Sequence, residues 1–245
     1  MPQGAYRSII WGSNKTHLFS YHPDKFGKYE LMSMWGFPAV EANWNYEGYE
    51  GKPVELLIFS AAEEVEIFIN GQSIGKKKVG FERPMPGSVR FETTYQPGKV
   101  EAVSYKNGAE ISRDVLETTG KPVGVRLVPE KTEMKANGMD VDYITIEIVD
   151  KDGSRVTDAE IPLKASLVIE PQDEKAEESI QGVAYLAGFG IGRPVTEENY
   201  TDNETTSYSG RAVAVLRSGY EKGTVRISVE AEGLPGAESI FIQVN

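Results

Sequence analysis

The groups in this sequence that are best suited to chemistry are its 37 Asp and Glu side chains. Two carboxylates that face each other across a glycosidic bond can hydrolyse that bond. With so many acids, however, pairs arise by chance, and most of these acids stand at alternating strand positions or in charged loops such as 172–179. We therefore interpret them as a solvated surface that singles out no catalytic pair.

Two patterns bear on metal binding. His17 and His22 have only Asp24 as a nearby acid, so no third ligand is evident and we interpret both as surface histidines. The stretch 150–153 (DKDG) resembles the beginning of a calcium loop, but Ile161 stands at the twelfth position, where that loop needs Glu. A hairpin turn explains the stretch better. We expect no metal site and no cofactor.

Glycines alternate in the stretch 188–193 (GFGIGR), which invites comparison with loops that bind phosphate. Such a loop needs a strand before it and a helix after it. Pro194 follows closely, and no strand–loop–helix pattern surrounds the stretch. We therefore predict an irregular strand or a loop between sheets.

Aromatic side chains are concentrated between residues 35 and 49 (WGFPAVEANWNYEGY). Exposed Trp and Tyr rings can stack on sugar rings, so the candidates for carbohydrate contact are Trp35, Trp44, Tyr46 and Tyr49. The alternative is that an irregular stretch rich in Gly, Pro and Asn uses large rings to cover the edge of a sandwich. We favour this packing role over sugar binding.

The elements that must position these residues are predicted to be strands almost throughout. Residues 65–69 (VEIFI) and 143–149 (YITIEIV) alternate in polarity, which is typical of half-buried strands. Further strands are expected at 53–60, 99–105, 109–116, 163–169, 206–218, 223–231 and 238–244. The best helix candidates are two short acidic stretches, 171–179 and 196–200, and both are compatible with loops.

Two Asn-Gly pairs predict tight hairpins, at 70–71 and at 107–108. A type I′ turn requires positive φ at both central residues, and Asn-Gly tolerates this best. In the first hairpin the simplest register places Ile67 opposite Ile74. Phe68 then points to the other face, where the second sheet, a loop or a partner should cover it.

Recurrent turn signals without long helical periodicity indicate an all-β chain of two immunoglobulin-like antiparallel β-sandwich domains in tandem. The natural break is the stretch 118–122 (TTGKP). It defines a first sandwich at 27–118 and a second at 119–245. Residues 1–26 lack a repeated strand pattern, so we expect them to be the tail of a preceding domain and a linker.

The composition restricts the partners and the chemistry of the chain. A formal net charge of −11 disfavours both nucleic acid and anionic membranes, and neither is an expected partner. The sequence has no cysteine, which removes disulfides and thiolate chemistry. It has no apolar run of membrane-spanning length, and its first residues lack the pattern of a signal peptide.

Several motifs occur in a specific order: WGFP at 35–38, Trp44, YEGKPV at 49–54 and VEIFINGQSIG at 65–75. In order and spacing they resemble the sandwich domain that follows the catalytic barrel in bacterial glycoside hydrolase family 2 enzymes, which are β-galactosidase-like. The stretches 185–192 (YLAGFGIG) and 208–218 (YSGRAVAVLRS) are similar to the final immunoglobulin-like domain of the same enzymes.

The resemblance also extends to the first residues and has two departures. Residues 5–11 look like the end of the last barrel helix and its exit segment. Phe37 stands where the family commonly has Trp, and Ile191 stands where it often has Asn.

The resemblance implies a non-catalytic accessory region that packs against the catalytic barrel of the same polypeptide and walls part of its substrate cleft. The family's two catalytic glutamates lie in that barrel, which needs about 250 residues of alternating strand and helix. No such pattern occurs here, so we expect the chain alone to be inactive. The parent is expected to be a bacterial enzyme, either exported or cytoplasmic.

Two alternatives to the accessory role remain open at this stage. One is a carbohydrate-binding module that uses the aromatic candidates between residues 35 and 49. The other is an interaction module on a bacterial surface, which would require a sorting signal or an anchor.

Overall fold

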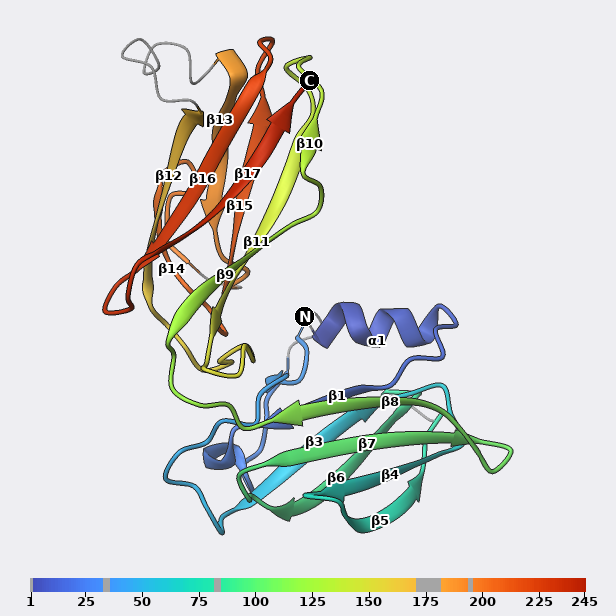
Figure 1. Ribbon diagram of the computed structural model, residues 1–245. Helices are drawn as coiled ribbons and strands as arrows, with labels where there is room; N and C mark the ends of the chain where they lie inside the picture. The colour runs from blue at the N-terminus through green and yellow to red at the C-terminus, as the bar shows by residue number, and fades with distance from the viewer. Residues whose placement is uncertain (1, 33–35, 82–84, 171–181, 194–195) are drawn as a thin grey trace. The chain divides into compact units, whose positions relative to one another are not determined.

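The computed structural model describes residues 2–32, 36–81, 85–170, 182–193 and 196–245. The chain forms two compact units, Met1–Thr118 (unit 1) and Thr119–Asn245 (unit 2). Each unit consists of two sheets that enclose an apolar core (Figure 1). The predicted all-β fold class of antiparallel β-sandwiches is confirmed.

Unit 1 has two four-stranded sheets. Sheet 1 has the order β2 (Val40–Glu41), β1 (His17–Tyr21), β3 (Pro53–Phe59) and β6 (Ser88–Thr94). Sheet 2 has the order β5 (Gln72–Lys78), β4 (Glu64–Ile69), β7 (Lys99–Lys106) and β8 (Ala109–Glu117). Alternate residues of these strands point inward because successive side chains of a strand face opposite sides. The core between the sheets includes Leu18, Leu56, Ile58, Val65, Ile67 and Val100.

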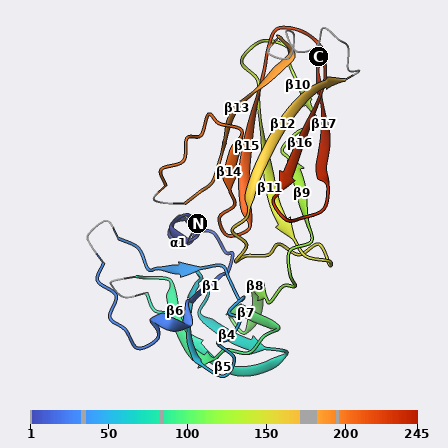
Figure 2. The same ribbon diagram turned by 90° about the vertical axis from the view of Figure 1, so that its left-hand side faces the viewer.

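A helix covers the outer face of sheet 1. This helix, α1 (Pro2–Ile10), lies beside β1 (Figure 2), and its Ile9 packs in one cluster with Phe19 and Phe59, outside the main core of unit 1. A short 3₁₀ helix, η1 (Pro23–Lys25), follows β1. None of the helices within the described residues is long and apolar enough to cross a membrane.

The first 26 residues differ from the expected tail and linker in one respect, because residues 17–21 form an inner strand of sheet 1. β1 lies between β2 and β3, and Leu18 is fully buried. The Asp114 carboxylate accepts a hydrogen bond from the Leu18 N–H at 2.8 Å, which ties β1 to β8 of the other sheet. Because β1 has only five residues, its sequence shows no clear alternation of polar and apolar residues from which the strand could be predicted.

The hairpin at 70–71 is confirmed, but its predicted register is wrong. Asn70 and Gly71 have φ of 50° and 81°, as a type I′ turn requires. A bulge between Ile67 and Phe68 pairs Ile67 with Gly75 instead of Ile74. Gly75 has φ of 127°, which lets the strand accommodate the extra residue. Phe68 is half-buried, so its ring is not left bare.

The second hairpin agrees with its prediction. Asn107 and Gly108 have φ of 52° and 77° and join β7 to β8.

Unit 2 has a four-stranded and a five-stranded sheet. Sheet 3 has the order β13 (Ala184–Gly190), β15 (Arg211–Ser218), β11 (Val141–Val149) and β9 (Gly124–Pro129). Sheet 4 has the order β10 (Glu133–Met134), β17 (Ala237–Val244), β16 (Gly223–Ala231), β12 (Pro162–Glu170) and β14 (Glu204–Thr206). The contact between β10 and β17 is parallel, and the other pairings are antiparallel. The inward face of β11 carries Ile144, Ile146 and Ile148, which are fully buried as their spacing predicts.

Three predictions for unit 2 have different outcomes. The expected strand 206–218 is interrupted at Ser209 and Gly210, which both have positive φ. The stretch 188–190 ends β13, in agreement with an irregular strand, because β13 has a bulge between Leu186 and Gly188. The stretch 196–200 is not helical, and the helix candidate 171–179 lies outside the described residues.

Candidate functional site

The predicted carbohydrate contacts include Trp44, which lies in the core of unit 1. Its side chain has 0% exposure. Its indole N–H donates to the Gln96 carbonyl oxygen at 3.0 Å, and its ring meets the Tyr95 ring edge-on at 5.0 Å between centroids. A ring with no exposed face cannot stack on a sugar while the unit remains folded. The structure therefore gives Trp44 a packing role.

Tyr46 has a similar environment. It is 3% exposed, and its hydroxyl lies 2.7 Å from the hydroxyl of Ser20. Burial raises the pKa of the Tyr46 phenol well above its ordinary value, so the group stays neutral. The backbone reaches this position through a local turn in which the Asn43 side-chain oxygen accepts the Asn45 N–H at 2.9 Å.

The remaining aromatic candidates lie differently. Tyr49 is partly exposed, and its hydroxyl donates to the Asp24 carboxylate at 2.7 Å. The His22 ring meets the Tyr49 ring edge-on at 5.1 Å between centroids, and its Nδ1 accepts the Asp24 N–H at 3.2 Å. This small polar cluster fixes η1 beside the aromatic core. Trp35 lies outside the described residues.

His17 and His22 do not converge on a common ligand position. The Nε2 atom of His17 lies 3.2 Å from the Ser8 hydroxyl, on the side of α1. Burial lowers the pKa of His17, with the nearby Asp114 carboxylate opposing this effect. Among the residues that the structure describes, no group of three or more His, Cys, Asp or Glu side chains could hold a metal ion.

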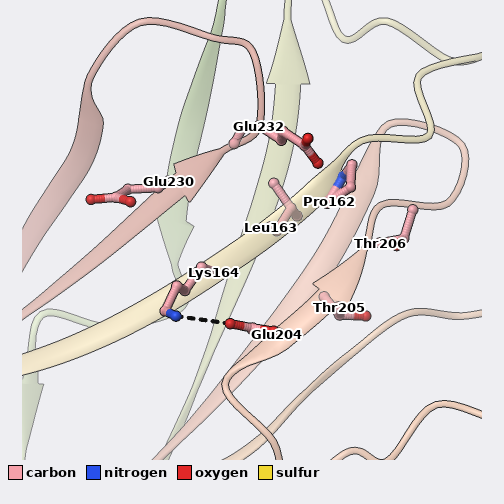
Figure 3. A pocket seen from close by; sticks show the side chains of 9 residues that line it. Pro162, Leu163, Lys164, Glu204, Thr205, Thr206, Glu230 and Glu232 are labelled. Atoms are coloured by element: carbon pink, nitrogen blue, oxygen red, sulfur yellow. Dashed lines mark hydrogen bonds and ion pairs between the residues drawn. The ribbon is translucent and has the colours of Figure 1, made fainter.

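An open hollow of about 500 Å³ in unit 2 has several carboxylates at its surface (Figure 3). It lies beside β12, β14 and β16, and its residues include Glu204, Glu230 and Glu232. Lys164 and Glu204 form an exposed ion pair at 2.8 Å, and the hydrogen bond from Lys164 lowers the pKa of Glu204. A general acid for glycoside hydrolysis needs a raised pKa. The lowered pKa of Glu204 therefore does not suit this residue to act as such an acid.

The outer face of sheet 3 carries a guanidinium–carboxylate cluster that the sequence analysis missed. Glu147 of β11 stands directly opposite Arg126 of β9 and Arg211 of β15. Arg126 donates from Nε and Nη2 to one carboxylate oxygen at 3.1 and 2.5 Å, and Arg211 donates to the other at 2.9 and 2.6 Å.

The buried carboxylate of this cluster stays charged. Glu147 is 6% exposed, and burial by itself would raise its pKa, but the hydrogen bonds from the two guanidinium groups outweigh burial and lower it. The three residues are far apart in sequence, and only the strand register brings them together. The sequence contained one sign of this cluster, which is that Glu147 stands between Ile146 and Ile148 and so occupies the opposite face of the strand.

A group of large apolar side chains is exposed on unit 1, and we call it the apolar surface: Tyr29, Leu31, Met32 and Phe81. Glu30 anchors the first part of it, because its carboxylate accepts the Ala39 N–H at 2.6 Å and the Tyr21 hydroxyl at 3.3 Å. Its two neighbours point outward, with Tyr29 100% and Leu31 98% exposed. Met32 and Phe81 line one shallow hollow. Large apolar side chains exposed beside one another, as Met32 and Phe81 are, can mark an interface.

The chain is a protein of two antiparallel β-sandwiches in tandem. Comparison with known proteins shows which family has this arrangement. Residues 125–239 match the model of the glycoside hydrolase family 2 C-terminal domain 5, and residues 51–112 match a domain of unknown function (DUF4982). A glycosyl hydrolase family 2 member from Bacteroides cellulosilyticus has a similar structure, with a TM-score of 0.83 and 31% identity over 100% of this chain and 30% of that chain.

Curated relatives agree with the family models. The β-galactosidase BoGH2A of Bacteroides ovatus is 26% identical over 78% of this chain and 21% of its own length. A β-glucuronidase of Formosa agariphila is 28% identical over 84% of this chain and 20% of its own length. The chain belongs to glycoside hydrolase family 2 and corresponds to its C-terminal β-sandwich region. It spans only about a fifth of the length of these two curated relatives.

Proposed function

We propose that this chain is the non-catalytic accessory region of a β-galactosidase- or β-glucuronidase-like enzyme, and that unit 1 packs against the enzyme's catalytic barrel. The observation that carries the proposal is a structural similarity to a family 2 enzyme that covers 100% of this chain but only 30% of the enzyme. The two sandwiches occupy the length of this chain, whereas a catalytic barrel requires about 250 residues of its own.

The apolar surface supports the packing role. Leu31 is 98% and Phe81 is 60% exposed, although burial of such a side chain is worth about 1.5–3 kcal/mol. The hydrogen bonds of Glu30 hold the loop that carries Leu31 in place, so the exposed position of Leu31 is fixed by the fold. A barrel of the same polypeptide would contact this surface without the entropic cost that a separate partner incurs.

The purified chain alone tests the non-catalytic assignment. We expect it to release no nitrophenol from nitrophenyl β-galactoside or nitrophenyl β-glucuronide, because the two sandwiches occupy the length of the chain and leave no room for a catalytic barrel. The parent enzyme, assayed in parallel, is the positive control. Turnover by the isolated chain above the buffer rate would refute the assignment.

Substitutions in the apolar surface test the packing role. We expect Leu31→Ser combined with Phe81→Ser to lower the stability of the parent enzyme by about 2–5 kcal/mol, because two buried apolar side chains are lost from the interface. The same pair should change the stability of the isolated chain by under about 0.5 kcal/mol, since both side chains are exposed there. Urea denaturation of both proteins, followed by circular dichroism, measures the difference.

The matched control is Phe241→Ser on β17 of unit 2, because Phe241 is exposed to a similar degree, 57%, and lies outside the apolar surface. Phe241→Ser should leave the stability of the parent enzyme unchanged. Equal effects of the double substitution on the parent and on the isolated chain would contradict packing through this surface.

A further inference from the structure

The cluster around Glu147 has more positive than negative charge. Arg126, Arg155 and Arg211 are close to a single carboxylate, which leaves a local excess of two positive charges in a chain whose formal net charge is −11. Within the described part of unit 2, no other carboxylate forms an ion pair with any of the three guanidinium groups. Among the described residues, Glu147 is thus the carboxylate that pairs with this group of arginines.

Glu147 holds the guanidinium groups of Arg126 and Arg211 in fixed orientations, because each of them donates two hydrogen bonds to one oxygen of this carboxylate. Each uses Nε and Nη2 on Glu147, which orients its plane against the carboxylate. Arg126 also donates from Nη1 to the Gly153 carbonyl oxygen at 2.9 Å. About half of each side chain is exposed, 47% for Arg126 and 53% for Arg211. The pair is thus rigid and still open to solvent.

Arg155 provides the third positive charge without a carboxylate of its own. It donates to the Ser209 carbonyl oxygen at 2.5 Å, in the turn that leads into β15. Burial, assisted by the nearby charge of Arg211, lowers the pKa of Arg155 to about 10, against the opposing effect of Glu147. A partly buried guanidinium beside another one is destabilised unless an anion joins the group.

The neighbouring acids have other partners. The Asp150 carboxylate accepts backbone N–H groups from Gly120 at 2.8 Å, from Asp152 at 3.0 Å and from Ser154 at 2.9 Å. The Asp152 carboxylate pairs with Lys151 at 2.7 Å. These hydrogen bonds and this ion pair hold both carboxylates in the 150–154 turn, and neither carboxylate forms an ion pair with Arg126, Arg155 or Arg211.

From this arrangement we infer that Arg126, Arg155 and Arg211 form a binding site for a small oxyanion, namely a carboxylate or sulfate group. Guanidinium N–H groups form charge-assisted hydrogen bonds with the oxygens of carboxylates and sulfate, and several guanidinium N–H groups of the cluster are not used on Glu147. The group could belong to an acidic sugar or be a free inorganic ion. This inference concerns unit 2 and is independent of the proposed packing of unit 1.

Titration of the full chain with defined probes tests the site. Sodium sulfate is compared with sodium chloride at equal ionic strength, and sodium D-glucuronate is compared with D-glucose plus the same sodium chloride. We expect saturable shifts of the arginine Nε–H NMR signals of Arg126, Arg155 and Arg211 with sulfate or glucuronate. A response to glucuronate without one to sulfate would assign the site to the sugar acid. Shifts no larger than those with chloride and glucose would overturn the inference.

Three variants separate anion binding from a purely structural cluster. Arg155→Gln should weaken sulfate binding at least tenfold, whereas Arg226→Gln, which removes an arginine paired with Glu170 elsewhere in unit 2, should not. Glu147→Gln should tighten binding several-fold, because it removes the competing negative charge. Unchanged or weaker binding by folded Glu147→Gln would overturn the inference, and this readout remains if Arg155→Gln does not fold.

Discussion

Trp44→Ala is expected to destabilise unit 1 by about 3–5 kcal/mol, which approaches the whole stability of a small domain. The indole is fully buried against the rings of Tyr46 and Tyr95, so its removal leaves a cavity in the core. The substitution also leaves the Gln96 carbonyl oxygen without its indole donor. Urea denaturation followed by far-ultraviolet circular dichroism measures the loss, and hydrogen exchange of β3 and β4 locates it in unit 1.

Two control substitutions distinguish packing from sugar binding. Trp44→Phe keeps most of the ring and removes the indole N–H, so it should cost much less than Trp44→Ala. Tyr49→Ala removes a partly exposed ring and should cost under about 1 kcal/mol. A Trp44→Ala chain of normal stability that had lost saturable binding to a sugar would instead support the carbohydrate-binding alternative.

Gly210→Ala is expected to destabilise unit 2 by about 3 kcal/mol or more. Gly210 has φ of 65°, and a Cβ at this position would lie 2.1 Å from the Val156 carbonyl oxygen. That oxygen belongs to the backbone, so only a displacement of the chain could relieve the clash. The Gly210 carbonyl oxygen also accepts the Ile148 N–H at 2.9 Å, so the displacement would disturb β11. Urea denaturation and hydrogen exchange of β11 and β15 provide the measurement.

Gly233→Ala is the matched control for Gly210→Ala. Gly233 also has positive φ, 74°, but its Cβ would meet no atom within 4 Å. It should cost about 1 kcal/mol, which is the conformational penalty alone. The difference between the two variants therefore isolates the steric contribution, and equal losses would show that Gly210 has no special packing role.

Most of the strands were predictable because their apolar residues have a period of two and their turns carry Asn-Gly or Asp-rich signals. β16 begins and ends at the predicted residues, and β11 extends its prediction by two residues at its beginning. These elements depend on local alternation, which the sequence displays directly. The order of the motifs from 35 to 75 also carried the family resemblance, which the comparisons support.

The remaining features depend on contacts between distant residues. The bulge that places Gly75 opposite Ile67 adds one residue to β5, and a turn signal alone does not reveal such an addition. The burial of Trp44 follows from Tyr95 and Gln96, which lie about fifty residues away. The same holds for the site on sheet 3, where Arg126 and Arg211 meet at Glu147 only through the register of three strands.

The position of β1 has a consequence for how the first sandwich can be divided. The matched segment 51–112 contains β3 to β7 but lacks β1 and the Asp114 carboxylate that binds the Leu18 N–H. Cutting the chain at residue 51 would uncover the backbone edge of β3 and the rings that α1 covers, including Phe59. We therefore expect the segment matched by the family model not to fold on its own. During synthesis, the hydrogen bond between Asp114 and the first strand can form only after residue 114 has left the ribosome, 96 residues after Leu18.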